Sequence, residues 1–103
     1  MYPLACNSEI TIKNIKASEL DANNFLHATH SVAVAGKFMN AASPGVISLF
    51  FANTHYPNFE SYIFAIADAM RHEYETIVNK GLFLQVDCPD LAMGRHIQYA
   101  NYD

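Results

Sequence analysis

A long amphipathic helix that runs directly into a short apolar strand constrains this chain more than any other feature. Asn58 is the expected N-cap of the helix, and Gly81 is the expected left-handed residue at its C-terminal end. Residues 82–86 (Leu-Phe-Leu-Gln-Val) follow at once and predict a short buried strand. The helix is predicted from apolar residues that recur at steps of three and four: Phe59, Tyr62, Ile63, Ile66, Ala69, Met70, Ile77 and Val78.

The first third of the chain predicts an extended segment followed by a helix. Residues 4–15 contain partly alternating isoleucines, which favours an extended segment. Ser18 with Asp21 three residues later resembles a capping box, so a helix is expected to begin at Ser18 and to end near His30.

The middle of the chain predicts a second buried strand. Residues 32–42 are largely apolar on both faces, which is typical of a parallel strand covered on both sides. Ser43-Pro44-Gly45 ends this strand, because proline lacks the backbone donor that pairing requires. Residues 46–52 are compatible with a short helix or an irregular apolar segment, and residues 53–57 predict a loop.

Strands that alternate with helices predict an α/β fold with a βαβαβ order and parallel strands. Right-handed crossovers would place both helices on the same side of one three-stranded sheet, as in the wall of a barrel. The chain has 103 residues, of which 51% are hydrophobic, so one folded domain spanning residues 1–103 is expected.

The composition argues against several classes of partner. The net charge is −4 and the six Lys and Arg residues are scattered, so nucleic acid is not an expected partner. The chain carries no signal-peptide pattern, and its most apolar run, residues 46–52, is far shorter than a membrane span. A cytoplasmic protein is therefore expected. Cys6 and Cys88 lie far apart and belong to no metal-binding motif, and a buried structural thiol is favoured over a nucleophile at Cys88.

Two polar clusters follow the predicted strands, at residues 40–45 and 87–96. The carboxyl ends of parallel strands open onto one face, where ligands bind in α/β folds. Asp87 is the leading candidate, as a carboxylate that accepts hydrogen bonds from an ammonium group or acts as a base. The alternative is that Asp87 only caps the following turn. Ser43 and His96 are the further candidates for substrate binding, although surface residence is the favoured explanation for His96.

Residues 38–47 (FMNAASPGVI) and 84–96 (LQVDCPDLAMGRH), together with the helix at 62–81, resemble the cobalamin-independent methionine synthase family. The resemblance implies part of a (β/α)8 TIM barrel that transfers a methyl group from a folate to a thiol such as homocysteine, with zinc activating the thiolate. It also implies that Asp87 binds the amino group of the substrate. Cys88 stands where methionine synthase itself usually has Glu, so the resemblance places the chain among the divergent relatives, some of which act on other thiols such as coenzyme M.

The resemblance also has consequences for the size of the chain. A (β/α)8 barrel takes roughly 250 residues, so this chain corresponds to about three of the eight βα units. The family's zinc ligands lie downstream of the matching segments, and no zinc site is expected in this chain. We therefore expect a fragment that is inactive alone and self-associates through exposed sheet edges. The alternatives are a small oligomeric binding or scaffold protein and a small enzyme that uses Cys88 and His96.

Overall fold

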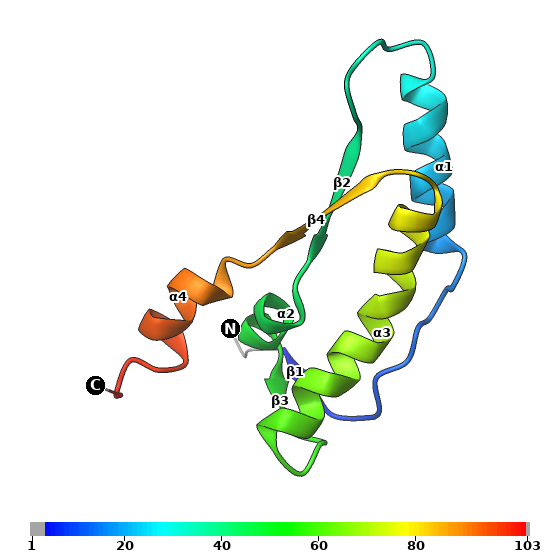
Figure 1. Ribbon diagram of the computed structural model, residues 1–103. Coiled ribbons are helices and arrows are strands. Elements are labelled where there is room, and N and C mark those ends of the chain that lie inside the picture. The colour runs from blue at the N-terminus through cyan, green and yellow to red at the C-terminus, as the bar shows by residue number, and fades with distance from the viewer. Residues whose placement is uncertain (1–3, 103) are drawn as a thin grey trace.

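The computed structural model describes residues 4–102 and has a mixed α/β architecture with parallel strands (Figure 1). Four helices and four short strands occupy this described part of the chain. In chain order, the elements are β1 (Ala5–Cys6), α1 (Ala17–Thr29), β2 (Phe38–Ala42), α2 (Pro44–Phe50), β3 (Ala52–Asn53), α3 (Phe59–Asn79), β4 (Phe83–Asp87) and α4 (Asp90–Ile97).

The long helix α3 forms as the sequence predicts. The Asn58 side chain accepts a hydrogen bond from the Ser61 backbone N–H at 2.7 Å, which satisfies one of the free donors of the first turn. Gly81 has a φ of 81°, a conformation that glycine adopts without a Cβ penalty. The side chains of Tyr62, Ile66 and Ile77 are buried along one face, so the caps and this part of the predicted stripe are confirmed, whereas Phe59 and Val78 are exposed.

The predicted middle and last strands pair in parallel, as β2 and β4. Phe38 lies opposite Phe83, and the register continues to Ala42 opposite Asp87. The Ser43 N–H then donates to the Asp87 carbonyl at 3.0 Å, which extends the pairing by one residue. This register places the carboxyl ends of the two strands side by side.

Helices α1 and α3 cover one face of the β2–β4 sheet, as predicted (Figure 1). The buried core joins one residue from each neighbouring segment: Ala22 of α1, Ala41 of β2, Ile77 of α3 and Leu82 before β4. The opposite face of the sheet carries Phe38 and Phe83, which are more than half exposed. The two faces therefore differ sharply in burial.

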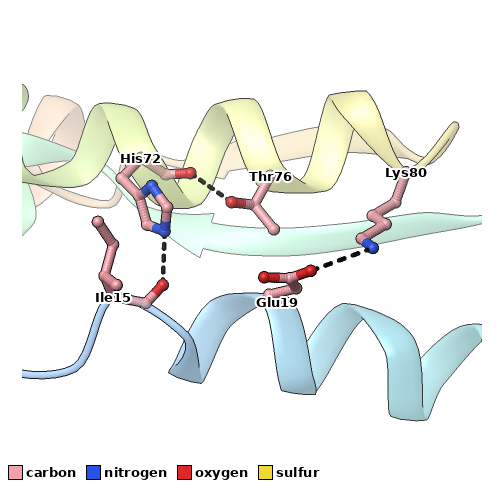
Figure 2. Close-up of polar contacts among 5 residues, drawn as sticks. All are labelled: Ile15, Glu19, His72, Thr76 and Lys80. Atoms are coloured by element: carbon pink, nitrogen blue, oxygen red, sulfur yellow. Dashed lines mark hydrogen bonds and ion pairs between the residues drawn. The ribbon is translucent and has the colours of Figure 1, made fainter.

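Polar contacts join α1 and α3 along their outer side (Figure 2). The His72 Nε2 atom lies 2.6 Å from the Ile15 carbonyl oxygen, so the ring donates from Nε2 to the segment that precedes α1. Glu19 and Lys80 form an ion pair at 3.6 Å, and both side chains remain partly exposed. These contacts fix the approach of α1 to α3 but add little to the buried core.

The expectation of one three-stranded sheet is wrong. Among residues 4–102 the strands form two separate two-stranded sheets, β1 with β3 and β2 with β4. Ala5 and Cys6 pair in parallel with Ala52 and Asn53. The sequence predicts no strand there, but a short helix or an irregular apolar segment up to residue 52 and a loop from residue 53. The N-terminal strand therefore does not extend the β2–β4 sheet.

The predicted strand over residues 32–42 is shorter in the structure. It begins at Phe38, and Val32 and Val34 lie exposed in the loop that precedes it. The physical reason lies in the register. The Phe83 N–H bonds to the Lys37 carbonyl at 2.9 Å, and β4 begins there, so residues 32–36 have no partner strand among the described residues.

Helix α1 begins at a different residue from the predicted one, and helix α2 resolves an alternative that the sequence leaves open. Helix α1 begins at Ala17 with Lys16 at its N-cap, so the capping box at Ser18 is wrong. The Ser18 hydroxyl is instead buried within the first turn, with no hydrogen-bond partner in the described part of the chain. The segment after Ser43 is a helix, α2, with Pro44 in its first turn, where a missing N–H costs nothing.

Searched over residues 4–102, the structure contains no helix with the length and apolar character that crossing a membrane requires.

Candidate functional site

The two predicted polar clusters meet at the carboxyl ends of β2 and β4. Asn40 and Ser43 come from the β2 side, and Asp87 and Asp90 come from the β4 side. Two side-chain hydrogen bonds cross between them, Asn40 to Asp87 at 3.0 Å and Ser43 to Asp90 at 2.8 Å. The prediction that both strand ends open onto the same face is confirmed for these four residues.

The Asp87 carboxylate is held by two amide donors. Its Oδ1 atom accepts from Gln85 Nε2 at 2.8 Å, and its Oδ2 atom accepts from Asn40 Nδ2 at 3.0 Å. The hydrogen bond from Gln85, followed by that from Asn40, lowers the pKa of Asp87 below its ordinary value of 3.8, against a smaller opposing effect of burial. A carboxyl with a lowered pKa is a weak base, so the arrangement favours binding of a cation over proton abstraction.

Ser43 links the strand ends to the helices that follow them. Its side chain is 4% exposed, accepts from the Val46 N–H at 3.1 Å as the N-cap of α2, and donates to Asp90 at 2.8 Å. The hydroxyl proton is thus already engaged. Ser43 therefore orients α2 and the start of α4, and any ligand would meet a hydroxyl without a free donor.

Gly45 allows the Asp90 carboxylate to sit close to the start of α2. A Cβ atom built on Gly45 would overlap the Asp90 side chain. The sequence shows this glycine only as part of a turn-like Ser-Pro-Gly segment, so its packing role could not be found from the sequence.

Tyr74 supports the site from the helix layer. Its hydroxyl donates to the Ala42 carbonyl at 2.6 Å, which ties α3 to the last residue of β2. Burial is the main cause that raises the pKa of Tyr74 above 10.0, so the hydroxyl stays protonated and able to donate. Nothing in the sequence pattern indicates this bond.

The remaining candidates lie on or before α4 and are exposed. His96 is in the last turn of α4, and no hydrogen bond joins it to Asp87 in the described structure. Cys88 is exposed, so the expectation of a buried thiol is wrong for this residue; the chain leaves the sheet directly after Asp87. Arg95 lines a hollow of about 470 Å³ between α2, α3 and α4, with Asp90, Phe59 and Tyr99.

The described residues do not fit the zinc ion that the family resemblance implies. Zinc in proteins is held by three or four Cys, His, Asp or Glu side chains. Over residues 4–102, no group of three or more such side chains is arranged to hold a metal ion. We therefore assign no step of any reaction in this chain to a metal.

No family model, no curated protein and no solved structure matches this chain. The candidate site is therefore defined by its own geometry, that of Asp87 and its neighbours.

Proposed function

We propose that the chain is part of a methyltransferase-like (β/α)8 barrel whose Asp87 cluster binds the ammonium group of an amino-acid thiol such as homocysteine. The observation that carries the proposal is the Asp87 carboxylate, which Gln85 and Asn40 hold at the carboxyl end of β4. The sequence resemblance of residues 84–96 to cobalamin-independent methionine synthases supports the same position and the same role.

An ammonium group suits this carboxylate for three reasons. Each Asp87 oxygen accepts one amide hydrogen bond, which leaves further acceptor capacity on both atoms. The lowered pKa keeps the side chain charged at all physiological pH values. A charge-assisted bond from an ammonium donor is about twice as strong as a neutral one.

The methyl transfer itself is proposed for a longer protein of the family, with zinc and a folate methyl donor, in the cytoplasm. This chain contributes the subsite that orients the amine of the substrate. Hydrogen bonds from Asn40 and Gln85 orient the Asp87 carboxylate. Ser43 and Tyr74 fix the carboxyl end of β2, the strand that contains Asn40. We propose that the isolated chain binds its ligand without turning it over.

Isothermal titration calorimetry with homocysteine tests this proposal. Asp87→Asn removes the charge and preserves the shape, so binding is expected to weaken by at least about tenfold, which corresponds to about 1.4 kcal/mol. Asp68→Asn is a matched control, because Asp68 is an exposed carboxylate on α3 that pairs with Arg71. It should leave binding unchanged.

Two ligand analogues separate recognition of the amine from other contacts. The desamino analogue of homocysteine should bind to wild-type protein as weakly as homocysteine binds to Asp87→Asn. Methionine, which keeps the ammonium group, should compete with homocysteine. Equal binding of homocysteine to the wild type and to Asp87→Asn would refute the proposal, and so would the absence of any binding to the wild type.

An oligomeric binding or scaffold protein is the second candidate function. It is favoured by the two sheets of only two strands each, which leave backbone edges unpaired in the described part of the chain. This candidate keeps the Asp87 site as a binding site and requires that the chain form a defined oligomer.

A further inference from the structure

The hollow between α2, α3 and α4 has the size of a small-molecule site. Its volume is about 470 Å³, and sites for small molecules occupy about 300–1,000 Å³. Asn40, Gln85 and Asp87 are not among the residues that line it. The ammonium subsite proposed above therefore does not account for this hollow.

One face of α4 forms a wall of the hollow. Leu91, Gly94, Arg95 and Gln98 follow each other at steps of one, three and four, so they lie on the same side of the helix, and all four line the hollow. A Cβ atom built on Gly94 would meet the Tyr99 ring at 3.9 Å, which is an ordinary van der Waals contact. Because Gly94 has no side chain, the middle of this wall stays open.

Two charged groups of opposite sign line the hollow without pairing with each other. Among residues 4–102, neither of the two ion pairs includes Arg95, so its guanidinium group has no carboxylate partner. The Asp90 carboxylate accepts one hydrogen bond, from Ser43 to its Oδ1 atom. A carboxylate offers about four acceptor positions, so Asp90 keeps capacity for a further donor. The hollow thus presents a cationic donor group and an anionic acceptor group.

Two aromatic side chains add apolar surface between these polar groups. Phe59 of α3 and Tyr99, which follows α4, both line the hollow, and each is 47% exposed. Aromatic rings pack favourably against other flat rings, in offset-stacked or edge-to-face arrangements. A ligand with a flat ring would therefore remove both side chains from water.

We propose that this hollow binds a small aromatic carboxylate that also carries an N–H donor. The carboxylate binds Arg95, because the planar guanidinium group forms two parallel hydrogen bonds with a carboxylate. The N–H group donates to Asp90, and the ring contacts Phe59 and Tyr99. A purely apolar ligand would bury both charged groups without partners, which costs free energy. An anion without a donor would meet only repulsion from Asp90.

This site and the proposed ammonium subsite are independent. The side chains that orient Asp87 are those of Asn40 and Gln85, and neither lines the hollow. Asp87→Asn should therefore leave binding in the hollow unchanged, and Arg95→Gln should leave homocysteine binding unchanged. Failure of one proposal is thus distinguishable from failure of the other.

Fluorescence anisotropy of indole-3-acetate, which has a flat ring, a carboxylate and an N–H group, tests the proposal. The chain contains no tryptophan, so indole emission comes from the ligand alone. The anisotropy should rise to saturation as wild-type protein is added. Arg95→Gln should weaken binding at least about tenfold, because it removes a charge-assisted pair. Arg71→Gln is the matched control, because Arg71 is an exposed arginine on α3 that does not line the hollow.

Two analogues test the polar groups of the ligand on wild-type protein, so these tests do not depend on the folding of a variant. Indole-3-acetamide lacks the charge and should bind at least about tenfold more weakly than indole-3-acetate. The compound 1-methylindole-3-acetate lacks the N–H donor and should bind at least about threefold more weakly, as expected for the loss of one hydrogen bond.

Far-UV circular dichroism identifies the variants that fold like the wild type, and the comparison uses these. Anisotropy that does not saturate with the wild type would overturn the proposal. Equal binding by Arg95→Gln and Arg71→Gln would also overturn it, as would equal binding of either analogue and indole-3-acetate. Loss of indole-3-acetate binding in Asp87→Asn would show that the ligand occupies the ammonium subsite instead, which overturns a separate site in the hollow.

Discussion

The Ser43 hydroxyl and the Asp90 carboxylate, 47 residues apart in the chain, meet in a hydrogen bond of 2.8 Å. Ser43 directly follows the last residue of β2 and caps α2, whereas Asp90 begins α4 after β4. One bond thus sets the direction in which the chain leaves both strands. The approach is possible because Gly45 leaves room for the carboxylate.

Gly45→Ala should therefore destabilise the protein. The new Cβ would overlap the Asp90 carboxylate, which must move and lose its bond to Ser43. We expect a loss of about 1–3 kcal/mol in the free energy of unfolding, measured by urea denaturation. In the Asp90→Ala background the clash is absent, so Gly45→Ala should cost much less. Equal costs in the two backgrounds would contradict the packing role of Gly45.

The buried core should contribute more to the free energy of unfolding than the ion pair between α1 and α3 does. Ile77 is 1% exposed, and Ile77→Ala should cost about 2–5 kcal/mol, with Ile77→Val costing about 1 kcal/mol. Glu19→Ala breaks the partly exposed pair with Lys80 and should cost no more than about 1 kcal/mol. Urea denaturation of all three variants ranks the contributions. A larger loss in the free energy of unfolding for Glu19→Ala than for Ile77→Val would contradict this prediction.

The pH dependence of the site should follow the carboxyl of Asp87. Its folded pKa lies below 3.8, so its two hydrogen bonds stabilise the fold above that pH and are lost as the pH falls through the folded pKa. Side-chain NMR titration should place the Asp87 midpoint below 3.8, and homocysteine binding should persist to the same midpoint.

The same titration tests which neighbour lowers the pKa of Asp87. Gln85→Ala should raise it most, and Asn40→Ala should raise it less, because the bond from Gln85 is the larger cause. Gln98→Ala removes a similar side chain on the C-terminal side of α4 and is the control. A shift after Gln98→Ala as large as that after Gln85→Ala would contradict this assignment.

Removal of the Tyr74 hydroxyl should loosen the end of β2. Tyr74→Phe keeps the ring but leaves the Ala42 carbonyl without its partner, at a cost of about 1 kcal/mol. Tyr102→Phe alters an exposed tyrosine and should change the free energy of unfolding by less than about 0.5 kcal/mol. Amide exchange at Ser43, whose N–H bonds to Asp87, should be faster in Tyr74→Phe than in Tyr102→Phe. Equal exchange in the two variants would show that Tyr74 does not position the strand end.

Local chemistry made α3 and the two strand ends predictable. The Asn58 cap, the apolar spacing and Gly81 act within a few residues of each other, so the sequence specifies them without knowledge of the rest of the fold. The same holds for the break at Pro44 and for Asp87 at the end of an apolar strand. Because parallel strands end at one edge, the meeting of Asn40 and Asp87 also followed from the order of the elements.

Only the tertiary structure decided that the N-terminal strand pairs outside the β2–β4 sheet, that Ser43 meets Asp90 and that Tyr74 meets the Ala42 carbonyl. Ala5–Cys6 pairs with Ala52–Asn53, and residues 32–36 stay unpaired, because a short strand forms only where packed helices bring a partner into register. The bonds from Ser43 to Asp90 and from Tyr74 to Ala42 depend on positions to within an ångström, and these are set by packing across the core. Sequence patterns encode the side-chain types and their spacing, whereas such distances arise only when separate elements have packed together.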